Sequence, residues 1–186
     1  MYGISKWVLT VLFSMLTAGV VAQSGNQGGG YVGIVYGLSV PDIANTKTHQ
    51  LYGVKGGSQI SDSYGFGGYH MVSSEETGRN NGDFSFSLTG LEFRSFLTGG
   101  DKKVYVGVRA GVSKFNTVEN STDVIFSPYH YGIVSGYDFK LFSLLNVGIE
   151  GSFMAMQRSL TTAGSTEVEL KPFHLMSFLG VINLAF

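Results

Sequence analysis

A histidine near a serine is the first feature of this sequence that could support catalysis. A serine nucleophile needs a histidine base within hydrogen-bonding reach and a carboxylate that orients the histidine. His130 is the best candidate base and lies between two tyrosines. In an extended segment, however, Ser135 faces away from His130, and Gly132 is the residue on the same face. We therefore predict no catalytic residues, and we expect His130 to be an interior or rim polar group.

Metal and cofactor chemistry have no support in the sequence. His49, His70 and His174 are scattered along the chain without the spacing of metal ligands. The chain has no cysteine, which excludes disulfides and thiolate metal sites. The formal net charge of -1 gives no indication of nucleic-acid binding. We predict no metal, no cofactor and no nucleic-acid partner.

Charged residues that alternate with small residues are the second chemical feature. Arg109 shares a strand face with glycines, and Glu150 shares one with Gly148 and Ser152. Because an unpaired buried charge is strongly unfavourable, charges of both signs inside a narrow barrel should pair. Pairs at the rims would contribute only about 0–1 kcal/mol. The hypothesis is an interior ion network whose candidate members are Glu92, Arg94, Arg109, Glu150 and Arg158, the last of them near a rim.

The elements that would position these groups are short β segments. The 27 glycines among 186 residues disfavour a helical core, since each costs about 1 kcal/mol in a helix interior. Longer polar loops alternate with shorter turns, as in transmembrane barrels. The expected strands are Tyr31–Ser39, His49–Gly57, Ser63–Ser74, Asp83–Leu97, Lys103–Phe115, Ile125–Phe139, Leu144–Ser159 and Glu167–Phe186.

Period-two patterning predicts which face of these strands meets lipid. In the segment 103–115, valines and one alanine alternate with Gly107, Arg109 and Gly111. An eight-stranded barrel has barely enough room for side chains, so the small and polar face is the better interior. The apolar face then meets lipid. The predicted fold is an all-β, eight-stranded, antiparallel up-and-down transmembrane β-barrel.

The segment Asp83–Leu97 departs from this pattern. Phe84, Phe86 and Leu88 share parity with Glu92 and Arg94, so one face would carry both apolar and charged groups. A β-bulge near Thr89 and Gly90 would reconcile the two halves.

The N-terminus has the order of a secretory signal. Lys6 precedes an apolar or small stretch, Val8–Val21, and Ala22 is followed by a polar residue. The apolar stretch falls short of the roughly 20 residues that a membrane helix needs. We predict a signal peptide over residues 1–22 and a barrel domain over residues 23–186.

The C-terminal strand carries the motifs of a known family. Phe178, Ile182, Leu184 and Phe186 lie on one alternating face and end in phenylalanine, which resembles the signal that the outer-membrane assembly machinery reads. The segments 104–107 (Val-Tyr-Val-Gly) and 136–139 (Gly-Tyr-Asp-Phe) resemble strand signatures of the small OmpA-like outer-membrane barrel family. Gly180 stands one place from the usual glycine of the assembly signal. We expect no peptidoglycan-binding domain after the barrel.

The resemblance implies a location in the bacterial outer membrane. The expected partners are outer-membrane lipid, lipopolysaccharide and the assembly machinery, and the expected state is a monomer. The predicted function is non-enzymatic, with a structural or surface-interaction role and a plugged lumen. Two alternatives stay open: a lipid A deacylase-like enzyme, or a narrow pore for small solutes. His130 resembles the deacylase histidine, but Gly132 stands where that family has its serine.

Overall fold

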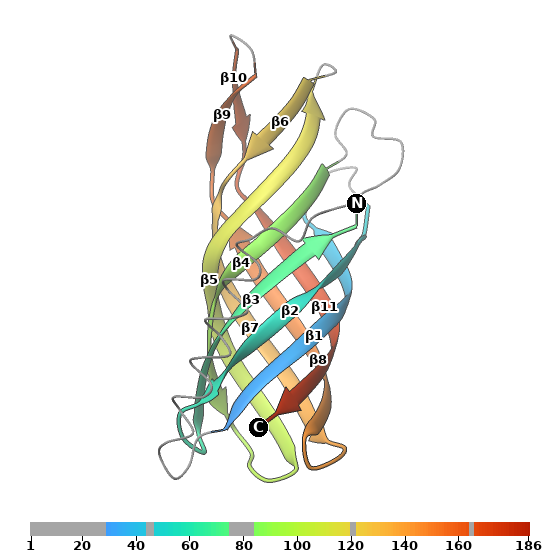
Figure 1. Ribbon diagram of the computed structural model, residues 1–186. Coiled ribbons are helices and arrows are strands. Elements are labelled where there is room, and N and C mark those ends of the chain that lie inside the picture. The colour runs from blue at the N-terminus through green and yellow to red at the C-terminus, as the bar shows by residue number, and fades with distance from the viewer. Residues whose placement is uncertain (1–28, 44–46, 75–83, 120–121, 164–165) are drawn as a thin grey trace.

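The strands of the chain close into a single barrel. The computed structural model describes residues 29–43, 47–74, 84–119, 122–163 and 166–186, so the predicted signal peptide lies outside the described residues. Each strand pairs antiparallel with its neighbours (Figure 1). The strands are β1 (Gly30–Pro41), β2 (His49–Gln59), β3 (Tyr64–Ser73), β4 (Phe84–Phe96), β5 (Lys102–Glu119), β6 (Thr122–Phe126), β7 (Tyr129–Lys140), β8 (Leu145–Met156), β9 (Ser159–Ala163), β10 (Thr166–Leu170) and β11 (Phe173–Ala185).

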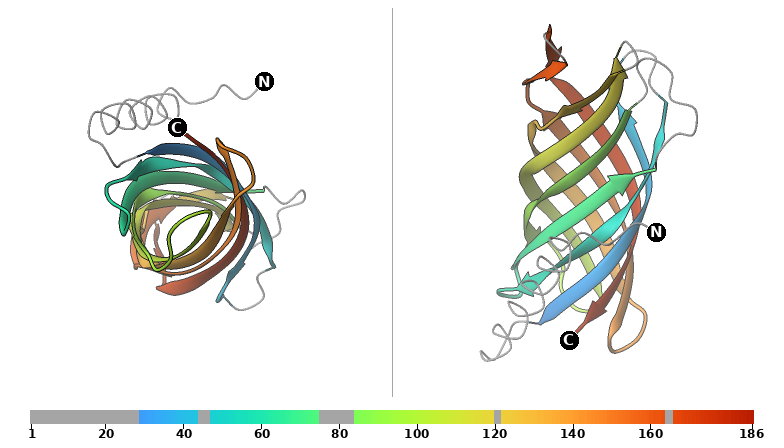
Figure 2. Two further views of the ribbon diagram at one scale, coloured as in Figure 1. Left: turned by 90° about the horizontal axis from the view of Figure 1, so that it is seen from below. Right: turned by 45° about the horizontal axis from the view of Figure 1, so that its top comes forward.

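Three of these strands continue others. β6 and β7 both pair with β5 in one continuous register across Pro128. β9 continues β8, and β10 continues β11. The pairing of β9 with β10 has the same register as the pairing of β8 with β11 on the other side of Pro172. Proline lacks the backbone N–H that a ladder requires, so it interrupts each strand at that point. The sheet order β4-β3-β2-β1-β11-β8-β7-β5 closes through β4 and β5. Over the described residues the barrel therefore has eight strands, which confirms the predicted fold; Figure 2 shows it along its axis.

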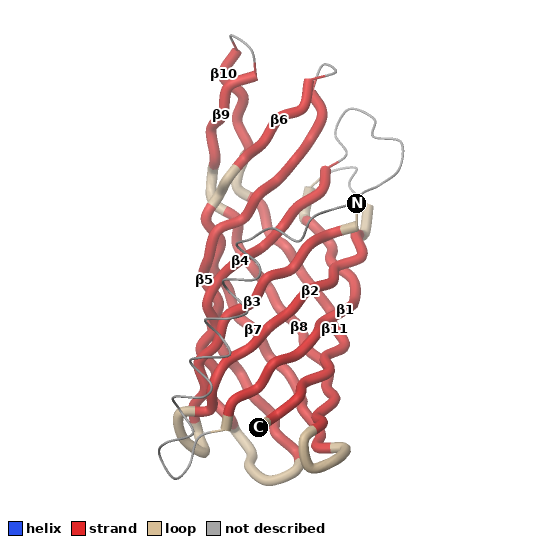
Figure 3. Tube along the Cα trace, in the orientation of Figure 1, coloured by secondary structure: helices blue, strands red, loops and turns tan. Residues whose placement is uncertain are grey.

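The two ends of the barrel differ. Short turns at residues 60–63, 97–101 and 141–144 lie at the same end as the C-terminus, which we call the turn rim (Figure 1). Gly100, at a φ of 78°, takes the left-handed conformation that the turn before β5 requires. The β5–β6 and β9–β10 hairpins extend beyond the barrel at the other end, the hairpin rim (Figure 3). The expected strands had ended at Phe115 and Ser159, with loops predicted over residues 116–124 and 160–166. These loop predictions were wrong in part, since most of the described residues in the two segments extend the strands.

The outer face is apolar, as the alternation predicted. On β1 the outward residues Ile34, Tyr36 and Leu38 are each more than half exposed. The outward positions of β8 and of β11 beyond His174 carry no charged residue. A band of this kind on a closed barrel is the surface that meets lipid. Within the described residues, no helix is long and apolar enough to cross a membrane.

The expected bulge in β4 is wrong. Its register runs without interruption against β3 and β5 through Thr89 and Gly90. Phe84, Phe86 and Glu92 therefore all face the lumen. The two halves of this face lie in different interior zones, because the lumen is apolar toward the hairpin rim and charged toward the turn rim.

Candidate functional site

The lumen is where the chain gathers its charged side chains, and Glu150 on β8 lies at the centre of the group. Its carboxylate accepts hydrogen bonds from Lys55 Nζ at 2.8 Å, Tyr105 Oη at 2.8 Å and Arg109 Nη2 at 2.5 Å. The Glu150 side chain is fully buried. Three donors from β2 and β5 thus converge on one carboxylate, whose neighbours on the same face of β8 are the small residues Gly148 and Ser152.

A second carboxylate, Glu92 on β4, completes the group. It accepts from Arg94 Nε with one oxygen and from Arg109 Nε with the other. Arg109 therefore bridges both carboxylates. The guanidinium of Arg94 lies 5.1 Å from the ring centre of Tyr31 and 4.5 Å from that of Tyr105, where the ring faces attract a cation.

The ion cluster, defined as Lys55, Glu92, Arg94, Arg109 and Glu150, holds three cations and two carboxylates, each at most 3% exposed. The structure brings together four of the five residues named from the sequence. Arg158 does not join them: it lies at the hairpin rim, 2.8 Å from Glu169, with side chains 60% and 40% exposed. Its strand is interrupted at Gln157 and Arg158, which places this residue beyond the barrel wall.

Lys55 is the member that the sequence analysis missed. It lies in the glycine-rich β2, on the face that also carries Gly53 and Gly57. That is the same pairing of a charge with small residues that singled out Arg109 and Glu150. The signal was therefore present, but β2 has too few large side chains to make its parity visible.

His130 lies inside the barrel. Its Nδ1 is 2.6 Å from Ser113 Oγ and its Nε2 is 2.5 Å from the Tyr69 hydroxyl, and the residue is 1% exposed. The serine that meets this histidine comes from the neighbouring strand β5, whereas Ser135 is exposed on the outer face. A site that acts on lipid acyl chains would have to be reachable from the bilayer, whereas His130 is buried in the lumen. Its hydrogen-bond partners among the described residues are a serine and a tyrosine, not a carboxylate.

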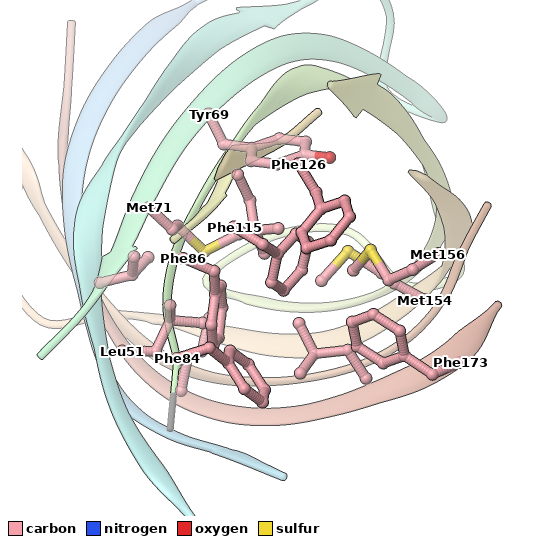
Figure 4. Packing of buried hydrophobic residues seen from close by; sticks show 14 of the residues in the cluster. Leu51, Tyr69, Met71, Phe84, Phe86, Phe115, Phe126, Met154, Met156 and Phe173 are labelled. Carbon is pink, nitrogen blue, oxygen red and sulfur yellow. The ribbon is translucent and has the colours of Figure 1, made fainter. Parts of the chain in front are cut away.

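The lumen between the ion cluster and the hairpin rim is filled with apolar side chains. Phe115 stacks on Phe86 with ring centres 5.4 Å apart and meets Phe173 edge-on at 5.3 Å. Figure 4 shows these rings packed with methionine and leucine side chains from the surrounding strands. The apolar zone, in which every member is at most 8% exposed, comprises Leu51, Met71, Phe84, Phe86, Leu88, Phe115, Phe126, Met154, Met156, Phe173 and Leu175.

The residues of the expected assembly signal lie on the outer face of β11. Phe178, Ile182 and Leu184 are exposed between β1 and β8, and Phe186 follows at the turn rim. No group of three or more His, Cys, Asp or Glu side chains that could hold a metal ion occurs in the described part of the chain.

Comparisons with known proteins find similarity in fold only. No protein-family model matches, and no curated protein matches. Neisserial surface protein A matches with a TM-score of 0.66 and 11% identity, over 86% of this chain and 97% of that chain. The attachment invasion locus protein Ail of Yersinia pestis matches with a TM-score of 0.57 and 14% identity, over 87% and 100%. The outer membrane protein OprG of Pseudomonas aeruginosa matches with a TM-score of 0.53 and 10% identity, over 86% and 96%. The chain therefore has the fold of small outer-membrane barrels, which supports the predicted location.

Proposed function

We propose that this chain is an integral outer-membrane protein without enzymatic activity, with a plugged lumen and a structural or surface-interaction role. The observation that carries the proposal is the filled interior. Two carboxylates and three cations fill the middle of the lumen, and apolar side chains fill the part toward the hairpin rim. A hydrated solute would have to displace both layers.

The orientation in the membrane follows from the rims. Transmembrane barrels have short periplasmic turns and longer extracellular loops. The turn rim then faces the periplasm, and the hairpins β5–β6 and β9–β10 face outward. We expect lipid and lipopolysaccharide to surround a monomeric barrel, and we expect the assembly machinery to recognise the strand that ends in Phe186.

A surface role rests on the hairpins. They extend the strands beyond the barrel and carry charged side chains, among them the pair Arg158–Glu169. The names of two similar barrels, a neisserial surface protein and an attachment invasion locus protein, agree with such a role. Because the side chains of the ion cluster are paired with one another and buried, the hairpins are the surface that we expect to take part in recognition.

Reconstitution into planar lipid bilayers tests the plug. The folded protein, checked by its faster mobility in SDS without boiling, is expected to give no steady single-channel current. The matched variant has Phe86 and Phe115 replaced by alanine. These changes remove two large side chains from the apolar zone and leave the residues of the ion cluster unchanged. Steady currents from the wild type would refute the plug and favour the narrow pore.

A further inference from the structure

Large apolar side chains are exposed on one side of the turn rim. Three of them, Leu141, Phe142 and Leu144, lie on the turn between β7 and β8, and two, Leu184 and Phe186, lie at the end of β11. The last residue of β11 donates its N–H to the Leu144 oxygen at 2.8 Å, so the turn and the end of β11 are adjacent (Figure 1). These five side chains, which we call the rim patch, are between 37% and 65% exposed. A group of exposed apolar side chains of this kind marks an interaction surface.

The other two turns of this rim have a different composition. The turns at residues 60–63 and 97–101 each begin with one large apolar residue and continue with polar residues and glycines, whereas residues 141–144 are Leu-Phe-Ser-Leu. The first two residues of this apolar turn donate their N–H groups to the Leu145 oxygen, at 2.8 and 3.1 Å. Backbone groups that are bonded within the chain leave water at a lower cost, so this turn suits an apolar environment.

The rim patch continues the lipid-facing surface of the barrel. On the outer face, Leu145 at the start of β8 is the register partner of Leu184, and Leu184 is the partner of Val32 on β1. Apolar residues therefore join the patch to the lipid-facing band of these strands. Lys102 on β5 is exposed on the same outer face, opposite Phe139. A lysine at the edge of an apolar surface can lay its stem along that surface and reach a lipid phosphate with its ammonium.

We propose that the rim patch is a lipid-binding surface, which inserts among the headgroups and upper acyl chains of the leaflet on the turn-rim side. Tyr131 is 55% exposed on the outer face of β7, and tyrosine favours the headgroup level of a membrane. A strand needs about 9–11 residues to cross a bilayer, so a strand with Tyr131 at one interface has Leu141 and Phe142 at the other. The partner of the patch is therefore the lipid leaflet and not a protein in the aqueous compartment. The proposal rests on the lipid-facing band of the barrel and not on the plug of the lumen.

Tryptophan fluorescence tests the position of the patch, because Trp7 is the only tryptophan of the chain. Trp7→Phe gives a background without tryptophan, and Phe142→Trp then places one on the patch. Each protein is refolded into phosphatidylcholine vesicles with and without bromine on the upper part of the acyl chains, and folding is checked by gel mobility without boiling. Bromine quenches a tryptophan that it contacts. Ile133→Trp, in the lipid-facing band, is the quenched reference, and Gly99→Trp, where a side chain meets nothing within 4 Å, is the reference in water.

The tryptophan at position 142 should be quenched nearly as strongly as the one at position 133. Quenching of Phe142→Trp no greater than that of Gly99→Trp, while Ile133→Trp is quenched, would place the patch in water and overturn the proposal. The rim patch would then be free for a protein partner.

A second comparison shows whether the patch or the introduced tryptophan holds the turn in lipid, since tryptophan itself favours interfaces. Leu141→Ser together with Leu144→Ser, in the Phe142→Trp protein, should lower the quenching toward that of Gly99→Trp. Ile60→Ser is the matched control, because Ile60 is 64% exposed on a turn outside the patch, and it should leave the quenching unchanged. Quenching that survives the loss of both leucines would also overturn the proposal.

Discussion

Replacement of Glu150 by glutamine is the sharpest test of the ion cluster. The cluster has three cations and two carboxylates, a net charge of +1, and Glu150→Gln raises it to +2. Glutamine keeps the shape of the side chain, so the change acts through charge. Lys55 and Arg109 each lose a charge-assisted hydrogen bond, worth about 1.5–3 kcal/mol apiece. Breaking a buried ion pair costs about 3–5 kcal/mol, so we expect a loss of unfolding free energy on this scale.

The matched control is Glu169→Gln at the hairpin rim. Glu169 also meets one arginine at 2.8 Å, but both side chains are exposed. Its loss should cost about 0–1 kcal/mol. Urea unfolding in lipid vesicles measures the free energy of unfolding of both variants. The folded fraction is read from gel mobility without boiling and not from tryptophan fluorescence, because the only tryptophan, Trp7, lies in the predicted signal peptide.

A double-mutant cycle separates pairing from burial. Arg109→Gln and Glu150→Gln should be non-additive, because each single change already breaks the same contact. The reasoning is refuted if the two costs add within about 0.5 kcal/mol. It is equally refuted if Glu150→Gln costs no more than Glu169→Gln.

Three further predictions concern assembly, catalysis and packing. Deletion of Phe186 should reduce the protease-protected barrel in the outer membrane while export continues; unchanged levels would contradict the assembly signal. His130→Ala should leave lipid A acyl chains unchanged by mass spectrometry, and a His130-dependent change would contradict the non-enzymatic proposal. Gly132→Ala places a methyl group against the backbone of Phe153 and should cost about 1–3 kcal/mol in urea unfolding, whereas Gly151→Ala meets nothing closer than 4.0 Å and should be neutral. Equal costs for the two glycines would contradict the packing argument.

Wherever large and small residues alternate, the sequence predicts whether a side chain faces the lumen or the lipid. In β5 and β8 the valines, Phe153 and Ile149 face outward and Arg109 and Glu150 face inward, because a strand sends successive side chains to opposite faces. Contacts between strands could not be predicted in the same way. Lys55 meets Glu150 because of the register and tilt of strands far apart in the chain, and no local pattern contains that information.

The error at β4 has a different physical origin. The bulge was inferred because one face of a strand was assumed to have one environment along its whole length. In this barrel the environment changes along the axis: Phe86 packs in the apolar zone, and Glu92, on the same face, reaches Arg94 and Arg109. The apolar residues in the first half of β4 and the charged residues in its second half therefore correspond to the two interior zones.

The order of the two zones has a consequence for access to the lumen. Charged groups are the more stable where some water can reach them, and the ion cluster lies next to the water-accessible cavity of the turn rim. The apolar zone lies on the other side, where Phe84 and Phe173 begin their strands at the hairpin rim. A polar solute that approaches from the hairpins would have to cross this zone before it reached the ion cluster, whereas the cavity at the turn rim is lined by Lys103 and Asp138. The order of the two zones therefore puts the ion cluster within closer reach of the turn rim than of the hairpin rim.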